Sequence, residues 1–478
     1  MENITNELKN RFGNSPDFVI KKLNISKKKI YLLFFDTLCD TKNINDFVLE
    51  YLSYLKLNKK KFLNLYDYIK EYIPNFSVKE INKIDEIIDN LFSGFLVIIV
   101  DDRYIALEFR KQLDSGINKA DNEKTIKGPK DAFTENYQTN IGLIRKRIRN
   151  ENLWLEEVKI GKKSNTKVGI MYVDDIVDKN IVNLVKERIK KIDIDSIPDS
   201  NYIYEFIRDD KSLFPSVLST ERPDLVSYKL LNGKIAIVVE NTPYVILLPA
   251  FFMEFFHTMD DYYQNNKGIT YTRIMRMAAF IISVSLPAIY IALITYNHEI
   301  IPPGLLVNFA IQKHGVPFPT IIEALVLTVT FEILRETDIR TPSTLGSALS
   351  IVGALVLGDA AVNAGLVSPI MVIVIAITAI SEMIFNVNDV SNVIKLWRLL
   401  FMVIASISGM IGVFISFILL IAEITSINSF GVPYLYPTAP FYKVDQGNDI
   451  VLNEKYKMSI RNMLTANKNR IRGKYEKD

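Results

Sequence analysis

Apolar and polar positions are unevenly distributed along this chain of 478 residues. The N-terminal half mixes charged positions with short apolar runs, whereas residues 277–425 hold apolar clusters long enough to enter a bilayer. The clearest cluster, Met277 to Thr295, carries no charge across 19 residues. A helix needs about 20 such residues to cross about 30 Å of hydrocarbon. The pattern therefore predicts a large soluble region followed by an α-helical transmembrane domain.

Short apolar runs in the N-terminal region alternate with helical patterns. The runs have strand length and are rich in Ile, Val, Tyr and Phe. They are Ile30 to Phe35, Phe95 to Val100, Tyr104 to Phe109 and Val168 to Val173. The helical patterns lie near Ile44 to Leu57, Val78 to Phe92, Thr134 to Arg149 and Ile176 to Lys190. This order predicts an α/β soluble region.

Composition suggests where the domains begin and end. The stretch Asp114 to Asp131 is polar and holds two glycines and a proline, so we expect it to separate two soluble subdomains. The expected parts are α/β subdomains at 1–112 and 132–240, a linker at 113–131, a helical membrane domain at 241–441 and a basic tail at 442–478.

Two segments mark the predicted end of the soluble region. Leu230 to Glu240 is expected to form a closing β-hairpin, with Asn232 and Gly233 as its turn. Thr242 to His257 is apolar but has only 16 residues, two prolines and a glutamate. It is short for a span, so we interpret it as an interfacial or re-entrant element of the membrane domain.

Four more apolar segments follow the first predicted span. They are Phe318 to Leu334, Ser343 to Asn363, Leu366 to Phe385 and Leu399 to Ile424. Glu323 and Glu332 in the first of them each cost roughly 2.5 kcal/mol or more at mid-bilayer, so this segment is expected at an interface or against protein. Arg273, Arg276 and a tail with nine Lys and Arg against five Asp and Glu place both ends inside. We predict four or five spans, four if the segment with Glu323 does not cross.

Charge, cysteine content and motifs exclude several classes of protein. The 57 Lys and Arg balance 54 Asp and Glu, so no basic field favours nucleic acid as a partner. The single Cys39 excludes an internal disulfide, and no Cys or His cluster has metal-ligand spacing. No phosphate loop, dinucleotide motif or catalytic constellation occurs. We therefore predict that the chain is not an enzyme and holds no catalytic residue, cofactor or metal.

The N-terminus begins MENITNELKNRF and has no apolar core of a secretory signal. Insertion is then directed by the later helices. The soluble region is therefore expected to stay in the cytoplasm, where a single cysteine remains reduced.

Small residues recur along Ser343 to Asn363. Gly346, Ser350, Ala354 and Gly358 are spaced every four residues and form one smooth stripe on a helix. Such a stripe fits ordinary close packing of helices, and it also fits a helix that lines a narrow pore in an oligomer. Near the end of this helix, Asp359 is either one member of a carboxylate ring that favours cations or an interfacial group that faces water.

Glutamates also lie within or near the predicted membrane segments, namely Glu323, Glu332, Glu382 and Glu423. Intramembrane charges are candidates for function because they are costly to bury in lipid. Only five Lys and Arg lie between residues 277 and 425, and they are Lys313, Arg335, Arg340, Lys395 and Arg398. The structural alternative is that two of the carboxylates pair with Arg335 or Arg340.

Four long segments resemble one protein family. They are SLFPSVLSTERPDLVSYKLLNGKIAIVVENTPYVILLPAFF at 212–252, GVPFPTIIEALVLTVTFEILRETDIRTP at 315–342, SIVGALVLGDAAVNAGLVSPIMVIV at 350–374 and SFGVPYLYPTAPF at 429–441. The chain resembles the A subunit of the GerA-type spore germinant receptors, and a related sporulation membrane protein of the stage V AF type shares that architecture. The likeness is dense over residues 205–442 and looser over the N-terminal subdomains.

This resemblance implies a multi-pass protein of the spore inner membrane, with its N-terminal region and tail in the cytoplasm. Family A subunits work with a transporter-like B subunit that binds the nutrient and with a C subunit that is a lipoprotein. The resemblance also implies a homo-oligomer, expected to be a pentamer in membrane lipid, that forms a nutrient-gated channel for monovalent cations. Possible pore-lining positions here are Ser350, Gly353, Val356, Leu357, Ala360 and Asp359.

Two alternatives to a receptor channel stay open at this point. A sporulation-type paralogue that amplifies ion release has the same family features. A secondary transporter needs matched halves with broken helices at mid-membrane, and the chain shows no matched halves although Pro287 and Pro369 interrupt predicted helices. Saturable uptake of a nutrient by this subunit alone would favour the transporter, whereas cation flux driven by a membrane potential would favour the channel.

Overall fold

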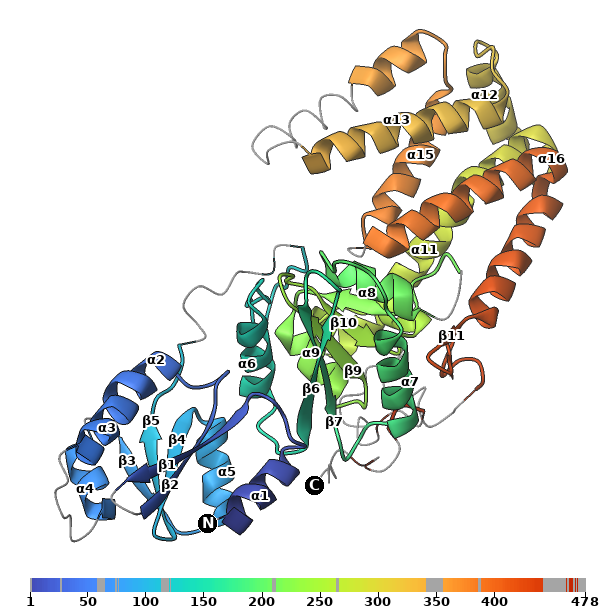
Figure 1. Cartoon of the computed structure of the whole chain (residues 1–478). Coiled ribbons are helices and arrows are strands. Elements are labelled where there is room, and N and C mark those ends of the chain that lie inside the picture. The colour runs from blue at the N-terminus through green and yellow to red at the C-terminus, as the bar shows by residue number, and fades with distance from the viewer. Residues whose placement is uncertain are drawn as a thin grey trace.

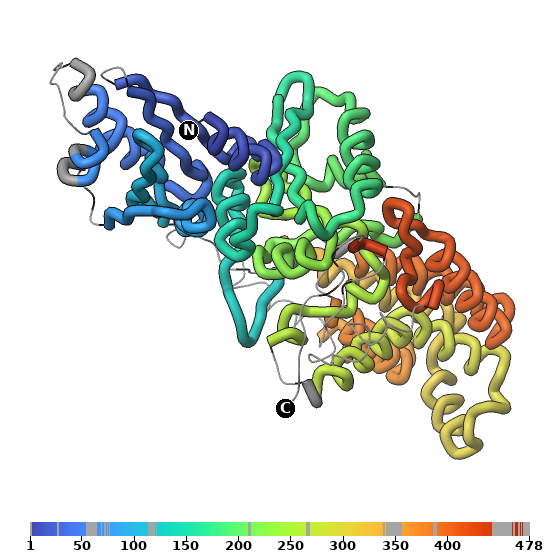
Figure 2. Tube along the Cα trace, turned by 90° about the horizontal axis from the view of Figure 1, so that it is seen from below, coloured from blue at the N-terminus to red at the C-terminus, as the bar shows by residue number. Residues whose placement is uncertain are grey.

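The computed structural model places two α/β lobes and a helical region in a row (Figures 1 and 2). It describes residues 2–25, 28–57, 65–73, 75, 77–112, 120, 122–208, 212–263, 266–340, 356–385, 388–441, 461, 464–466, 469 and 471. The predicted fold class, an α/β region of two subdomains followed by a helical domain, is confirmed.

The first lobe is built on a five-stranded antiparallel sheet in the order β1-β2-β4-β5-β3. Its strands are β1 (Phe18–Ile25), β2 (Lys28–Phe35), β3 (Val78–Ile81), β4 (Phe95–Val100) and β5 (Arg103–Glu108). Its helices are α1 (Glu2–Arg11), α2 (Thr41–Ile44), η1 (Asn45–Leu49), α3 (Glu50–Leu57), α4 (Leu65–Tyr72) and α5 (Ile84–Phe92). All six side chains of β4 are buried because helices cover both faces of the sheet.

The second lobe holds another five-stranded antiparallel sheet, in the order β6-β7-β9-β10-β8. Its strands are β6 (Leu153–Ile160), β7 (Thr166–Val173), β8 (Leu218–Thr220), β9 (Ile235–Val239) and β10 (Val245–Leu248). Its helices are α6 (Tyr137–Arg147), α7 (Lys179–Lys190), α8 (Ser200–Ile207) and α9 (Pro223–Leu230). One face packs on α7 and α8 and the other on α6 and α9.

The two lobes repeat one topology. Each begins with a helix and a β-hairpin, continues through helices, an edge strand and another helix, and ends with a second hairpin whose strands are adjacent in the sheet. Asp40 caps the first helix after the hairpin in lobe one, and Asp178 does so in lobe two. Gly94 and Gly233 precede the last hairpins with φ of 78° and 85°. The chain therefore contains an internal structural duplication in its soluble part.

A buried ion pair joins the lobes. The guanidinium of Arg145 on α6 donates to both carboxylate oxygens of Asp17, with Nη2 2.8 Å from Oδ1, and it lies 4.6 Å from the ring centre of Phe35. The Arg145 side chain is fully buried. Trp154 Nε1 donates to the Arg11 carbonyl at 3.2 Å beside this pair. The lobes are thus fastened by polar contacts that are sealed from water.

Two predictions for the end of the soluble region are wrong. Leu230 to Glu240 is not a hairpin, because α9 ends at Leu230 and the turn at Gly233 leads from this helix into β9. Thr242 to His257 is not a re-entrant element, because it contains strand β10 of the second sheet and a short helix, η2 (Phe252–Phe256). Its apolar character comes from burial between two protein layers, which length and hydropathy alone do not distinguish from lipid.

The helical region contains α10 (Asp260–Tyr263), α11 (Asn266–Thr295), η3 (His298–Ile300), α12 (Pro303–Lys313), α13 (Thr320–Arg340), α15 (Pro369–Glu382) and α16 (Asn388–Ser426), with a further helical stretch at 356–363. Among the described residues, two helices are long and apolar enough to cross a membrane, over Gly268–Thr295 and Val390–Ser426. After α16 the chain forms a two-residue strand pair, β11 (Asn428–Ser429) with β12 (Val432–Pro433).

The longest helix, α16, folds back on itself at Gly409. This residue has φ 63° and ψ −141°, a conformation open to glycine and strained for other residues. The ring centres of Phe401 and Phe417 lie 5.0 Å apart, whereas 16 residues of straight helix would separate them by about 24 Å. The segment predicted as one span, Leu399 to Ile424, is therefore two antiparallel helical arms (Figure 1). Asn297, just after α11, accepts a hydrogen bond from Met410 N at 3.0 Å, so this backbone amide at the turn has a partner.

Candidate functional site

The strongest concentration of buried charge lies where the second lobe meets the helical region. Asp261 on α10 is paired with two arginines from the first turns of α11. Arg276 binds both carboxylate oxygens at 2.8 Å, and Arg273 Nε lies 3.1 Å from Oδ2. Burial alone would raise the pKa of Asp261, but the two guanidinium groups outweigh it and lower that pKa. This cluster fixes α11 to α10, and Arg276 also donates to the Phe256 carbonyl of η2 at 2.7 Å.

A second buried cluster lies on η2. Lys229 Nζ is 2.7 Å from the Glu254 carboxylate, and Lys234 also pairs with it while donating to the Pro249 carbonyl at 2.6 Å. Burial favours the neutral acid, yet the two ammonium groups lower the pKa of Glu254 to about 2. The carboxylate therefore stays ionised and holds η2 on α9 and β9.

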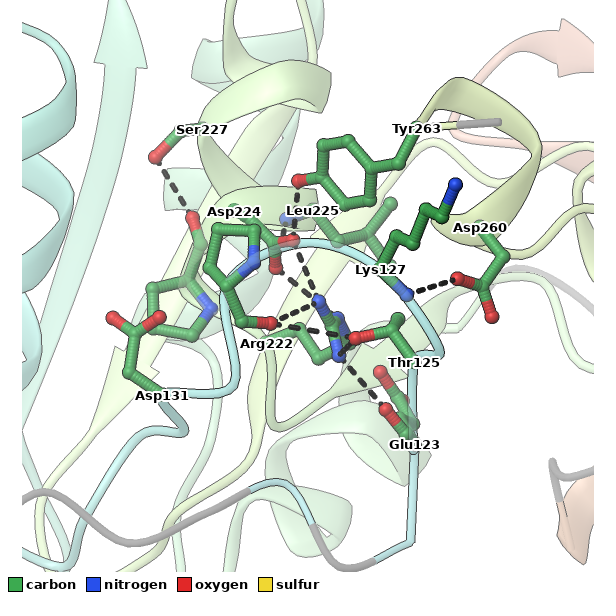
Figure 3. Close-up of polar contacts among 12 residues, drawn as sticks. Glu123, Thr125, Lys127, Asp131, Arg222, Asp224, Leu225, Ser227, Asp260 and Tyr263 are labelled. Carbon is green, nitrogen blue, oxygen red and sulfur yellow. Dashed lines mark hydrogen bonds and ion pairs between the residues drawn. The ribbon is translucent and has the colours of Figure 1, made fainter. Parts of the chain in front are cut away.

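Arg222 forms the centre of a third cluster, shown in Figure 3. It precedes α9 and is only 2% exposed. Its guanidinium binds Asp224 twice, at 2.7 and 3.1 Å, and donates to the carbonyls of Glu123 and Pro129 at 2.9 and 3.0 Å. Thr125 Oγ1 accepts a further bond at 3.3 Å. One arginine thus holds the described part of the segment that connects the lobes, and we call residues 122–131 the strap.

The strap also touches the residues that lead into α11. Ile126 N and Lys127 N donate to Asp260 at 3.1 and 3.3 Å, and Tyr263 OH donates to Asp224 at 2.6 Å. Figure 3 shows the contact of Lys127 with Asp260 and that of Tyr263 with Asp224 near Arg222. A displacement of the strap therefore reaches α10 directly. The described part of the predicted linker is therefore a structural bridge between the second lobe and α10.

Glu123 in the strap is the group of this junction that is poised to titrate. Burial, with help from the nearby carboxylates of Glu221 and Asp224, raises the pKa of Glu123 to about 7. A hydrogen bond from Thr220 Oγ1 at 2.6 Å and the charge of Arg222 oppose this shift without cancelling it. The junction thus binds or releases one proton near neutral pH.

The last helix is fastened to the second lobe as well. After α16, Ser429 Oγ donates to the Ser216 carbonyl at 2.6 Å and accepts from Ala250 N at 3.1 Å. Phe430 and Tyr434 are buried, and the Tyr434 carbonyl accepts a hydrogen bond from Phe252 N at 2.9 Å. Glu423, near the end of α16, accepts from Ser212 Oγ at 3.0 Å. The lobe therefore grips both α11 and α16.

The charges predicted within the apolar segments form a second site between α13, α15 and α16. Glu382 is paired with Arg335 and, at 3.0 Å, with Arg398. Glu332 is 2.6 Å from Lys395 and 3.5 Å from Arg398. The structure thus brings Glu332 and Glu382 together through a shared arginine.

The remaining predicted charges lie apart from this network. Arg340 binds Glu336 on its own helix at 2.6 Å. Glu323 is buried and accepts a hydrogen bond from Ser368 N at 3.0 Å, with Lys313 Nζ 3.9 Å away. Among the described residues, no group of three His, Cys, Asp or Glu side chains is placed to hold a metal ion.

The predicted pore segment is described only in its second half. Gly346, Ser350, Gly353 and Ala354 lie outside the described residues. Val356, Leu357, Gly358, Asp359 and Ala360 belong to the helical stretch at 356–363. Val356 is 57% and Leu357 48% exposed, and Asp359 and Ala360 are exposed as well. Their roles as pore-lining or packing residues stay predictions.

Sequence reasoning missed the junction clusters. Arg222, Asp224 and Asp261 looked like ordinary polar residues of a soluble region. One feature of the sequence was a possible signal. Three charged residues, Glu221, Arg222 and Asp224, flank a proline at the start of a helix, a position that normally faces water. Strong burial of such residues requires paired partners, and only the tertiary structure supplies them.

Comparisons with known proteins agree with the resemblance seen in the sequence. A family model described as Bacillus/Clostridium GerA spore germination protein matches residues 6–464. Spore germination protein KA of Bacillus subtilis (strain 168) is 38% identical over 444 residues, covering 91% of this chain and 81% of that protein. Spore germination protein GerLA of Bacillus cereus is 31% identical over 450 residues, covering 92% of this chain and 90% of that protein.

One solved structure is also similar. It is the crystal structure of the N-terminal domain of the A subunit of the Bacillus megaterium spore germinant receptor GerK3. The identity is 32%, the match covers 52% of this chain and 94% of that chain, and the TM-score is 0.41.

Glu123→Gln should change how stability depends on pH. The pKa of Glu123 is higher in the folded chain, about 7, than its ordinary value of about 4.5. Its contribution to the free energy of unfolding is therefore fully present below pH 4.5 and is lost as pH rises through 7. We expect the wild type to lose stability from pH 5 to pH 8 more steeply than the variant. Thermal unfolding of the full chain in detergent at several pH values measures this.

The matched control is Glu205→Gln, at an exposed glutamate of α8, which should leave the pH dependence unchanged. Parallel curves for wild type and Glu123→Gln would contradict the assignment.

The pair Glu382–Arg398 should be strongly coupled in a double-mutant cycle of Glu382→Gln and Arg398→Met. Both side chains are nearly buried, at 2% and 5% exposure, and breaking such a pair costs about 3–5 kcal/mol. The coupling energy is expected at about 1–3 kcal/mol. The control cycle, Glu336→Gln with Arg340→Met, joins exposed groups and should give about 0.5 kcal/mol or less. Equal coupling in the two cycles would show that the buried network does not hold the helices together.

Proposed function

This chain belongs to the GerA family of spore germination proteins, and on that premise we propose that it is the A subunit of a spore germinant receptor. Its copies assemble in the inner membrane of the spore and form a nutrient-gated channel for monovalent cations. The family match over residues 6–464 supports the receptor role. The exposed helical stretch at 356–363 supports the channel.

The surface of this stretch is the observation that carries the channel proposal. Val356 and Leu357 are apolar and about half exposed, and Asp359 is exposed on the same short helix. Lipid would suit the two apolar side chains but not the carboxylate, which is costly in hydrocarbon. A water-filled path enclosed by several copies of this helix accommodates both kinds of side chain. The stretch therefore lines a shared conduit, with Ala360 facing it as well.

Gating follows from the same residues. Val356 and Leu357 form an apolar constriction that stays dry in the closed ring. Nutrient binding to the transporter-like B subunit favours the open ring. The closed-to-open equilibrium can shift only by as much as the nutrient's affinities for the two states differ. The C subunit, a lipoprotein, completes the receptor. A ring of five copies with Asp359 at its mouth favours cations.

The junction clusters supply the mechanical link. Because the second lobe holds both α11 and α16 through buried contacts, a rotation of the lobe moves these helices with it. The strap, which binds both Arg222 and Asp260, strengthens this link between the second lobe and α10. We place both lobes and the described tail residues on the cytoplasmic side, because Thr465 and Arg461 contact the second lobe.

The transporter alternative is less well supported by the geometry. A carrier needs helix breaks near the middle of the membrane, where unwound backbone binds substrate. The break at Gly409 lies beside Tyr296 and Asn297, which follow the end of α11. It is therefore at one end of the helical bundle and acts as a hairpin turn.

Leu357→Ala should open the channel without nutrient. Removing the branched side chain widens and wets the constriction, so spores carrying the variant should leak cations and germinate spontaneously. The measurement is cation release and loss of refractility in nutrient-free buffer. Leu366→Ala, at an equally exposed leucine beyond the helix, is the matched control and should behave like wild type. Dormant variant spores with normal protein levels would show that Leu357 is not the constriction.

A further inference from the structure

The internal duplication exposes a difference between the lobes at one position. In the first lobe, the chain after β5 crosses the end of the sheet and pairs with the loop before α2. Asp40 N donates to the Phe109 carbonyl at 2.7 Å, and Lys111 N donates to the Leu38 carbonyl at 2.8 Å. Cys39 and Arg110 form an antiparallel bridge. This crossing segment closes the sheet and orders the start of the helix that Asp40 caps.

In the second lobe, the residues that follow the last strand, β10, do not pair with the loop before α7 in this way. After β10 the chain turns through η2 toward the membrane helices, so the place taken by residues 109–111 in the first lobe is open to another segment. The C-terminal tail takes it. Asp178 N donates to the Thr465 carbonyl at 3.1 Å, and Val177 forms an antiparallel bridge with Ala466.

These contacts match those of the first lobe position by position. Asp178 stands where Asp40 stands as a helix cap, and the bridge of Val177 repeats the bridge of Cys39. The glycine before the last hairpin is also equivalent. A Cβ at Gly94 would lie 3.2 Å from the Cα of Arg110, and a Cβ at Gly233 would lie 2.6 Å from the Thr465 carbonyl oxygen.

We propose that the second lobe carries a docking groove for an extended peptide, and that the tail around Thr465–Ala466 of the same chain is the peptide that completes the fold. The recognition is that of strand addition, in which main-chain hydrogen bonds give affinity and small pockets give specificity. This inference does not depend on the proposed channel.

The groove selects small side chains. Thr465 and Ala466 are fully buried, and Thr465 Oγ1 donates to the Asn232 carbonyl at 2.9 Å. Because Ala466 is fully buried, a long charged side chain such as arginine at this position would not fit. Gly233 keeps the floor of the groove open, because any Cβ there would collide with the peptide backbone.

Contacts on the two sides of the groove extend the interaction. Arg461 Nε donates to the Leu231 carbonyl at 2.8 Å, and Asn469 Nδ2 lies 3.3 Å from the Asp175 carboxylate. The tail beyond Phe441 carries nine Lys and Arg against five Asp and Glu, which complements the acidic loop from Asp174 to Asp178. The tail thus fastens the chain that leaves the last membrane helix to the same lobe that holds the first.

A truncation and a peptide test the groove. The full chain ending at residue 460 should unfold at a lower temperature than the wild type in detergent. A fluorescein-labelled peptide of residues 461–471 should bind this truncated chain and restore its unfolding temperature. The full-length chain should bind the peptide at least tenfold more weakly, because its own tail fills the groove. The matched control peptide carries Ala466→Arg and should lose binding at least tenfold.

A disulfide tests the same contact without truncation. Cross-strand neighbours have Cβ atoms close enough for a disulfide, so Val177→Cys combined with Ala466→Cys should oxidise within one chain. The native thiol does not interfere, because burial raises the pKa of Cys39 to about 12. Failure of the disulfide to form, together with an unchanged unfolding temperature and no peptide binding, would overturn the proposal. Covalent dimers on a non-reducing gel would also overturn it, since they would show that the tail serves a second copy.

Discussion

The structure depends on pairing every charge that is buried between the second lobe and the membrane helices. An isolated ion in such a place costs several kcal/mol, and this cost is offset only when partners and hydrogen bonds are fixed in position. Asp261 meets this condition with Arg273 and Arg276, and Glu254 meets it with Lys229 and Lys234. Glu254 holds η2 on the lobe, and Arg276 joins Asp261 to the Phe256 carbonyl of η2 at 2.7 Å, so α11 cannot leave the lobe without breaking these buried contacts.

This constraint connects the soluble region with the membrane. The strap binds Arg222 of the second lobe and Asp260 of α10, and Tyr263 binds Asp224, so these contacts join the second lobe to the start of the helical region. At the other end of the chain, Ser429 and the buried aromatic residues after α16 hold the last helix on the same lobe. The proposed channel needs such a rigid connection, because a flexible joint would not transmit a rotation of the lobe to the helices. The titrating Glu123 lies inside this connection and makes it sensitive to pH.

Sequence patterns predicted most of the soluble fold because its central strands are continuous apolar runs between polar turns, as in β2 and β4. They failed at Val245 to Leu248, because an apolar segment buried by protein has the same composition as one buried in lipid. They also failed at Gly409, where a single glycine reverses the direction of a helix. The duplication escaped notice because it is carried by a few aligned positions, such as Asp40 with Asp178 and Gly94 with Gly233. The carboxylates of the apolar segments were identified from the sequence, since a charge among apolar residues is visible without coordinates. Their partners were not all found, because Arg398 and Lys395 reach them across helices.

A distance measurement between the second lobe and the turn of α16 at Gly409 tests the rigid connection most directly. Nitroxide labels at Lys190→Cys on α7 and Ile411→Cys on the second arm of α16, both exposed positions, would be placed on the full chain in lipid with excess unlabelled protein. Double electron–electron resonance should give one narrow distance distribution, and Asp261→Asn should broaden it. A broad distribution in the wild type, or one that Asp261→Asn leaves unchanged, would contradict the account.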